Sequence, residues 1–246
     1  QEGFIEDDVD AIDYLTVREL SLTYDRLPYN SYVRAGRFKP QYGWHIPDHT
    51  AFIRRDLGFD QNRQVFGIGA GYNPQYLFAH TSLFYQGLDG WPGELGDEAF
   101  GGTLQVGYRA LGWQGGANVQ LLDRTNGQNE QTAGLFWGVN LYPVVYLGEL
   151  DLRIKSDEVE SGQVGSSGLF AYHEVNWLVL RGFTALATYH WADPNLDLLD
   201  DHKHRGTLGL QWNPYTYVQL DLQYRANFLA SDFTEHELLF ILHSFL

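Results

Sequence analysis

Basic side chains gather at both ends of segment 40–63, which has no strand pattern of its own. If this segment folds into a narrow pore, its cations lie at a constriction, where their field on a passing anion is strengthened. Alternatively, the arginines pair with Asp48, Asp56 and Asp60 and only fix the segment. Both interpretations stay open. The candidate cations are Arg34, Arg37, Lys39, Arg54 and Arg55, with Arg34 and Arg37 on opposite faces of one regular strand.

A second group of charges alternates along single extended segments. Mixed signs at a spacing of two residues typically pair across strands and line a wet interior. We therefore predict that these side chains face inward. They are Glu149, Asp151, Arg153 and Lys155 on 144–155, Asp221 and Arg225 on 218–226, and Arg109 on the polar face of 100–109.

Histidines offer the remaining chemistry. His45, Asp48 and His49, or His202 with His204, could bind a cation, but neither set has a third ligand at proper spacing. His80 and Ser82 share a face, as in an outer-membrane lipid hydrolase, yet an orienting group and oxyanion donors are not visible. With 0 Cys there is also no thiol chemistry. We predict no catalytic residues, no metal site and no cofactor.

The elements that position these side chains are β-strands. Apolar and polar residues alternate repeatedly over the roughly 9–11 residues that a tilted membrane strand needs. A helical period would spread both kinds over both faces. The predicted strands are 14–25, 30–39, 64–72, 76–86, 99–109, 113–122, 131–141, 144–155, 168–178, 182–191, 205–213, 216–227 and 236–246.

Connections alternate between short and long, as in outer-membrane barrels with periplasmic turns and extracellular loops. The predicted short turns are 26–29, 73–75, 111–112, 142–143, 180–181 and 213–215. The predicted long loops are 40–63, 87–98, 123–130, 156–167, 192–204 and 228–235. The long loops carry many acids, which either attract cations, including ions that bridge lipopolysaccharide, or simply form a solvated surface.

Aromatic residues flank the short turns. Turn chemistry explains Asn-Pro at these places but not the rings beside it. We predict a girdle at the periplasmic headgroup level. Its members are Tyr72, Tyr76, Tyr142, Tyr146, Trp212 and Tyr217.

Together these patterns predict an all-β fold, an antiparallel transmembrane barrel of about 12–16 strands. The first and last predicted strands run in the same direction, so an even barrel needs another strand. We favour 14 strands with part of the N-terminus absent. The acidic segment 1–12 is set apart from a single barrel domain, 13–246. Small inward residues, Gly67, Gly69, Gly71, Gly101, Gly107 and Gly116, leave space for water, an inserted loop or a partner polypeptide.

Composition agrees with this class. Charged residues are 19%, aromatic residues 15%, and mean hydropathy is −0.31. No run of 18 apolar residues is present, which argues against a transmembrane helix. The net charge of −15 argues against a nucleic-acid partner. The chain starts at Gln1 without a leader pattern, so we expect that a signal peptide has been removed.

The segment Tyr32–Leu57 contains Gly36-Arg37-Phe38-Lys39-Pro40 and, further on, Thr50-Ala51-Phe52-Ile53-Arg54. It resembles a segment of the phosphate-selective porins and related porin-like barrels. The resemblance covers about a tenth of the chain. It implies a diffusion channel whose early loop carries basic residues toward the lumen. The terminal Ser244-Phe245-Leu246 departs from the usual terminal Phe.

Two functions follow as hypotheses. The first is a porin-like channel, not an enzyme, in the outer membrane of a Gram-negative bacterium, surrounded by lipid and lipopolysaccharide, for passive diffusion of small hydrophilic solutes or ions. The alternative is a scaffold barrel that sheathes a lumenal or periplasmic protein, such as a cytochrome in an electron conduit. A homo-oligomer is compatible with the first. The sequence fixes neither the solute nor the charge selectivity.

Overall fold

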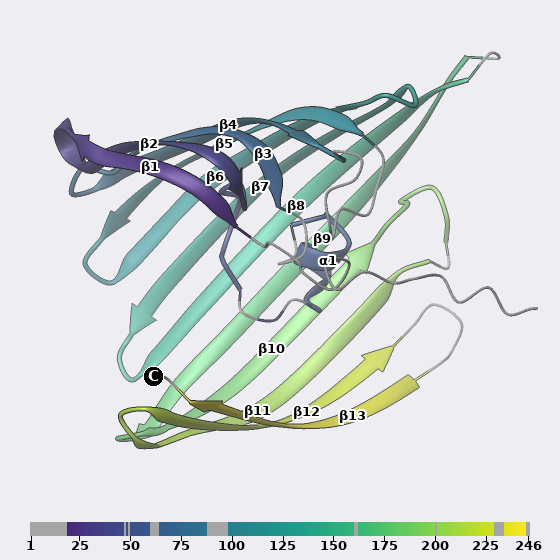
Figure 1. Cartoon of the computed structure of the whole chain (residues 1–246). Helices are drawn as coiled ribbons and strands as arrows, with labels where there is room; N and C mark the ends of the chain where they lie inside the picture. Colours follow the sequence, from purple (N-terminus) through teal and green to yellow (C-terminus); the bar gives the residue numbers. More distant parts are fainter. Residues whose placement is uncertain are drawn as a thin grey trace, which may run out of the picture.

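The computed structural model of the chain describes residues 19–46, 48, 50–59, 64–87, 98–159, 162–199, 201–228 and 234–244. These residues form one antiparallel sheet of 13 strands in chain order, curved around a central space (Figure 1). The predicted all-β antiparallel fold is confirmed. No helix in the described ranges has the length and apolar character to cross a bilayer.

Each predicted strand corresponds to an observed one. The strands are β1 (Leu20–Leu27), β2 (Ser31–Phe38), β3 (Val65–Tyr72), β4 (Leu77–Gln86), β5 (Ala99–Ala110), β6 (Trp113–Arg124), β7 (Gln128–Leu141), β8 (Val144–Val159), β9 (Gly162–Leu180), β10 (Phe183–Asp193), β11 (Lys203–Tyr215), β12 (Val218–Phe228) and β13 (Thr234–Ser244). A 3₁₀ turn spans Pro28–Asn30, and a single α-helical turn, α1, spans Phe52–Arg55.

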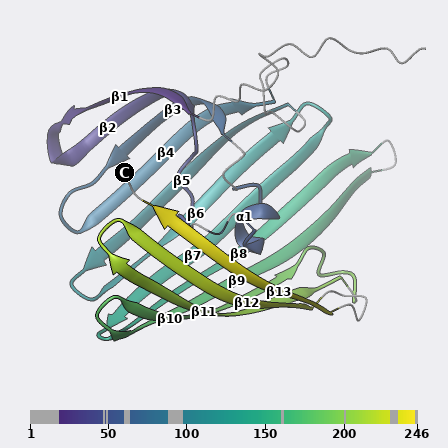
Figure 2. The same cartoon turned by 60° about the horizontal axis from the view of Figure 1, so that its bottom comes forward.

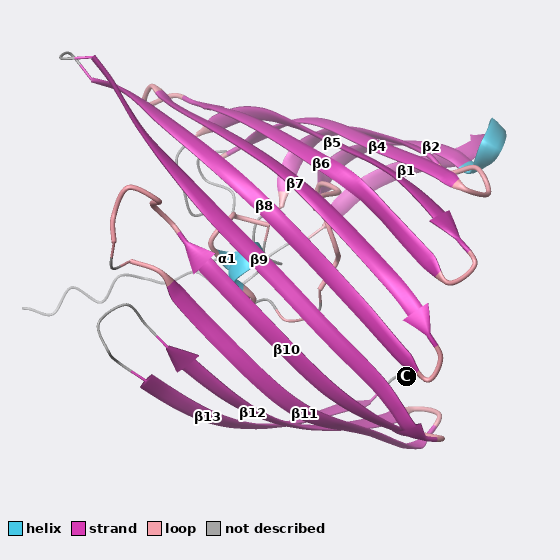
Figure 3. Cartoon of the chain, turned by 180° about the vertical axis from the view of Figure 1, so that it is seen from behind, coloured by secondary structure: helices cyan, strands magenta, loops and turns pink. Residues whose placement is uncertain are grey.

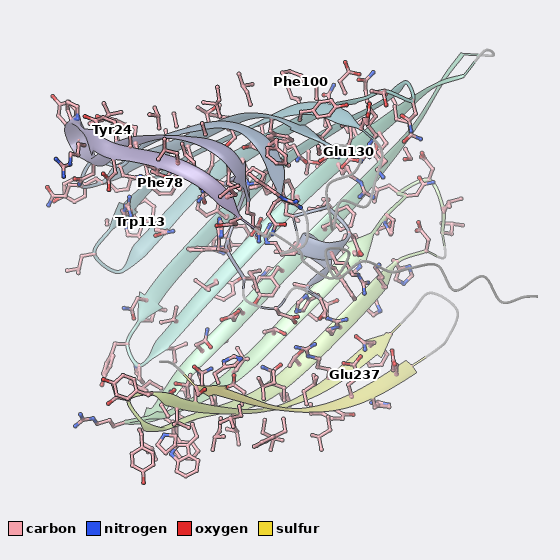
Figure 4. The ribbon with its side chains drawn as sticks, in the orientation of Figure 1. Tyr24, Phe78, Phe100, Trp113, Glu130 and Glu237 are labelled. Carbon is pink, nitrogen blue, oxygen red and sulfur yellow. The ribbon has the colours of Figure 1, made fainter. Side chains whose placement is uncertain are left out.

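The two faces of the sheet differ as the alternation requires. Leu104 of β5 pairs with Val119 of β6 on the outer face, where they are 48% and 39% exposed. The neighbouring pair, Thr103 and Gln120, faces inward and is buried. In Figure 4, Phe100 lies on the outside of the same wall. The sheet therefore has an apolar outer face and a polar inner face.

Two of the predicted long loops are wrong. β6 and β7 are joined through residues 125–127, and the β8–β9 ladder continues to the pair Val159 and Gly162. The backbone ladder goes on after the apolar alternation ends. Alternation records which side chains lie on the apolar outer face, whereas the hydrogen bonds need only a neighbouring strand. These strands are therefore longer than their apolar pattern.

One short turn is also misplaced. The sequence put it at 213–215, but β11 continues to Tyr215, and the turn lies at Thr216 and Tyr217. The register with β12 shifts between Trp212 and Tyr215. Pro214 cannot donate a ladder hydrogen bond, and an irregularity of this kind tolerates it. Asn-Pro therefore marks a bulge beside the turn here.

β1 and β13 are the two edges of the sheet, and no described strand joins them (Figure 2). The opposite side is a continuous wall, which Figure 3 shows from behind. The fourteenth strand expected from the sequence, like segment 1–12 and the terminal Phe245-Leu246, lies outside the described residues.

Candidate functional site

The segment between β2 and β3 leaves the wall and enters the space enclosed by the sheet. Figures 1 and 2 show α1 inside the curve of the strands. Phe52 and Ile53 of α1 are buried together with Tyr42 of the same segment and with Phe170 and Tyr172 of β9. Burial of these apolar side chains fixes the segment against the inner wall. We call residues 39–64 the inserted loop; its described part around α1 lies inside the curve of the sheet, as one of the two interpretations required.

An ion pair holds α1 to β8. Arg54 Nη2 lies 2.5 Å from Glu149 Oε2, with both side chains almost fully buried. The same carboxylate oxygen accepts the backbone N–H of Trp44 at 2.9 Å. Two residues further along β8, Asp151 Oδ1 accepts the hydroxyl of Tyr42 at 2.8 Å. These bonds hold residues 42–44 and α1 of the inserted loop against one strand.

The middle of the loop, at Asp48 and Thr50, is held by β11 and β12. Asp48 Oδ2 lies 3.1 Å from Arg225 Nη2 of β12 and 4.0 Å from Arg205 Nη1 of β11. Thr50 accepts from both guanidinium groups at 2.8 and 3.1 Å. Although burial raises the pKa of Asp48, the bonds from Thr50 and the charge of Arg225 bring it below its ordinary value. Asp48 is therefore ionised at neutral pH.

Asp56 forms a third attachment. Its Oδ2 lies 2.7 Å from Lys203 Nζ of β11, and its backbone carbonyl accepts Arg153 Nη1 of β8 at 2.6 Å. The loop thus crosses the interior between β8 and β11–β12. It narrows the enclosed space from within.

The predicted cations divide into two groups. Arg54 pairs with Glu149, and Arg55 pairs with Asp56 at 3.1 Å. Asp48, proposed from sequence as a partner for loop arginines, pairs with arginines of the wall instead, and Asp60 lies outside the described residues. The charge of Arg54 is therefore balanced by a buried acid, as the loop-fixing interpretation requires, whereas Arg55 shares the single charge of Asp56 with Lys203.

The other cations lie on β2 and β5. Arg34 faces inward, 3.9 Å above the Phe38 ring, and donates to the Lys39 carbonyl at 3.3 Å. Arg37 is buried on the other face of β2, in register with Phe66 of β3. Arg34 and Arg37 thus lie on opposite faces of the strand, as a regular strand predicts. Arg109 donates to Asn73 Oδ1 at 3.1 Å. Within the described residues, no ion pair to an acid is formed by Arg34 or Arg109.

The predicted ladder lies on the inner wall, but its charges pair with the loop as much as across strands. Glu149 and Asp151 contact the loop, whereas Asp221 accepts from Gln219 at 2.9 Å. Lys155 lies 3.7 Å from Glu130 of β7. Charge pairing thus joins the loop to the wall and the wall strands to each other.

Sequence reasoning missed Arg205 and His190. Arg205 Nε donates to Asn227 Oδ1 at 2.6 Å, in addition to its bonds with Thr50. His190 is buried with its ring edge-on to Phe52 and to Tyr172. Arg205 alternates with Thr207 and Gly209 on one face of β11, and this pattern could have identified it as an inward-facing residue. No local signal connects His190 with the loop.

The space beside the inward glycines is filled mainly by aromatic rings of the wall itself. A Cβ on Gly107 would lie 2.3 Å from Phe78 Cζ, and one on Gly116 would lie 2.6 Å from Phe136 Cζ. Tyr32 covers Gly71 in the same way. Water, loop or partner were the expected occupants; the observed ones are mainly aromatic side chains of the neighbouring strands. Phe78 is on the inner side of the wall in Figure 4.

The histidines do not converge on a metal centre in the described ranges. His202 and His204 have ring centroids 5.4 Å apart, but no group of three or more His, Asp or Glu with suitable placement occurs among the described residues. His49 is outside them. His80 Nδ1 contacts the Tyr32 hydroxyl at 3.2 Å, and Ser82 is buried on the same face.

The predicted girdle residues lie beside the short turns. Tyr72, Tyr76, Tyr142, Trp212 and Tyr217 are exposed, and Tyr146 is half-buried. Further rings join them: Tyr76 stacks with Tyr108 at 6.0 Å, and Trp212 stacks with Phe183 at 5.6 Å. Aromatic side chains thus gather outside the rim of the short turns.

No family model matches the sequence, and no curated protein matches it. Several solved structures match its fold, among them a porin and an outer-membrane channel. A porin superposes with a TM-score of 0.61 at 11% identity, covering 87% of this chain and 78% of that chain. The outer membrane channel DcaP of Acinetobacter baumannii gives a TM-score of 0.58 at 11% identity, covering 87% of this chain and 72% of that chain. The fold is therefore that of the porin-type outer-membrane barrels, to which the sequence resemblance also pointed.

Proposed function

We propose that the protein is an outer-membrane channel for passive diffusion of small hydrophilic solutes or ions. One observation carries this proposal: the wall is apolar outside and polar inside, and a loop crosses the enclosed space. Soluble proteins rarely expose apolar surface of this extent. A polar interior behind it has no role in a solid core, but it suits a water-filled lumen.

The orientation follows from the rims. The aromatic residues at the short turns form the periplasmic girdle, and the strands that extend beyond the bilayer, β8 and β9, reach outward from the opposite face. Outward Leu and Val contact lipid. The localisation is the outer membrane of a Gram-negative bacterium, with lipopolysaccharide around the outer rim. Enzymatic activity is not part of this proposal.

The inserted loop sets the size limit. It contacts β8 on one side and β11–β12 on the other, so solutes pass beside it and not through an open cylinder. A loop fixed by ion pairs on both sides gives a constant cross-section. The sheath alternative requires this interior for a partner protein, and no observation favours it.

Liposome swelling tests the proposal. Vesicles that contain the folded protein are placed in isosmotic solutions of neutral sugars, from a pentose to a trisaccharide. We expect rapid swelling with the pentose and slower swelling as the sugar grows, because the loop narrows the path. Vesicles with the same amount of heat-unfolded protein are the control. Folded protein that leaves vesicles sealed to the pentose contradicts the proposal.

A further inference from the structure

A cavity of about 240 Å³ lies between the inserted loop and the inner faces of β4–β7. Gly43, Trp44 and His45 of the loop form one side, and the wall forms the other. This volume is smaller than the roughly 300–1,000 Å³ of drug-sized sites. It suits a solute about as large as one ring.

The wall of the cavity carries one permanent charge. Arg109 is the only Lys or Arg among the described residues that line it, and none of those residues is acidic. Desolvation and the nearby charges of Lys39 and Arg54 lower the pKa of His45, so its imidazole adds no permanent charge. The cavity therefore presents a single permanent positive charge, and no acidic residue of its described lining balances that charge.

The guanidinium of Arg109 has hydrogen-bond donors that the described residues do not all satisfy. Nη2 donates to Asn73, while Nε is buried without a hydrogen-bond partner among the described residues. Buried donors without partners are uncommon and costly. An anion in the cavity would accept from this group and balance its charge. The amide of Gln114 adds a further neutral polar group to the same lining.

Aromatic rings lie directly beside this charge. The Arg109 Cζ is 5.1 Å from the centroid of Phe78, and Phe78 is 6.1 Å from Phe136. Trp44 meets Phe136 edge-on at 5.5 Å. The cavity thus combines one cation with a flat apolar wall.

We propose that this cavity is a binding subsite for small organic monoanions that carry a flat apolar group, such as an aromatic carboxylate. The carboxylate binds Arg109 and the ring packs against the aromatic side of the cavity formed by Phe78, Phe136 and Trp44. This inference rests on the proposed channel function, since the subsite lies beside the path that the loop narrows. It departs from what the sequence resemblance implied. Phosphate carries more charge at pH 7, has no apolar part, and would leave the rings unmatched.

Titration calorimetry of the purified protein in detergent tests the subsite without requiring an open pore. The probes are benzoate, its neutral analogue benzamide, and inorganic phosphate. We expect benzoate to bind at least tenfold more tightly than either of the others. The variant Arg109→Gln should weaken benzoate binding about tenfold or more, because a charge-assisted bond is lost. Arg109→Lys should recover part of it.

Arg181→Gln is the matched control, because Arg181 is exposed at the short turn between β9 and β10, outside the cavity; it should bind like the original chain. Equal benzoate binding by Arg109→Gln, or phosphate binding as tight as benzoate, overturns the subsite. The two proposals fail separately. A chain that conducts chloride but does not bind benzoate loses the subsite and keeps the channel. A chain that binds benzoate through Arg109 but never conducts keeps the cavity and loses the channel.

Discussion

The guanidinium of Arg54 and the carboxylate of Glu149 lie 2.5 Å apart, with side chains only 2% and 0% exposed. One belongs to the inserted loop and the other to the wall. Removing one member of a buried pair leaves the other charge uncompensated. The position of the loop therefore depends on both.

Glu149→Gln should detach the loop locally. Breaking a buried pair costs about 3–5 kcal/mol, so amide exchange in 52–56 should accelerate by at least a hundredfold. Hydrogen exchange in detergent measures this. Asp123→Asn, on the outer face of β6 away from the loop, should leave exchange in 52–56 unchanged. Protection that survives Glu149→Gln would show that apolar packing alone holds α1.

Asp48 makes the other attachment pH-dependent. Its pKa is lower in the folded protein than its ordinary value, so the stabilisation is complete above the ordinary value and is lost as pH falls through the folded one. We expect single-channel current to be quiet from pH 8 to about 5 and to become noisy only as pH falls through the lowered pKa of Asp48, below the ordinary aspartate value of about 3.9. Asp48→Asn should be noisy at neutral pH. A variant as quiet as the original chain at pH 7 would remove this attachment from the account.

Because aromatic rings pack directly over inward glycines, one methyl group added at such a glycine should destabilise the fold. A Cβ on Gly107 would lie 2.3 Å from Phe78 Cζ and 2.8 Å from the Gly115 carbonyl. Gly107→Ala should therefore destabilise the barrel by about 1–3 kcal/mol, as overpacking does. The temperature at which the folded band disappears on a gel reports this. Gly206→Ala is the control, since no atom lies within 4 Å of its added Cβ. Equal effects of the two would contradict the packing described here.

The outer face should reject charge where it meets lipid. Leu150, in the middle of the membrane part of β8, is 39% exposed outward. Leu150→Arg should cost about 2–4 kcal/mol in unfolding from vesicles with urea. Leu199→Arg, in the loop after β10 and 92% exposed, should cost almost nothing. A tolerated arginine at 150 would mean that water, not lipid, covers this face.

The strands could be read from sequence because the bilayer imposes a period of two on each of them. For the same reason, the sequence pattern did not predict the ends of β6–β9, which extend past the apolar part of the wall. The inserted loop was foreseen as one of two possibilities, but its partners were not. The curvature of the whole sheet brings Arg54 to Glu149 and Asp48 to Arg225. No spacing along the chain encodes such pairs. Arg109 was on the predicted inner face, but its isolation from acids depends on which side chains the loop brings beside it.

Single-channel recording in a planar bilayer tests the channel most directly. The sample is protein whose folded state has been verified by its altered gel mobility before heating. We expect discrete, stable current steps that scale linearly with voltage, and larger steps for Glu149→Gln as the loop loosens. Folded protein that inserts into the bilayer and carries no current would contradict a water-filled lumen beside the inserted loop.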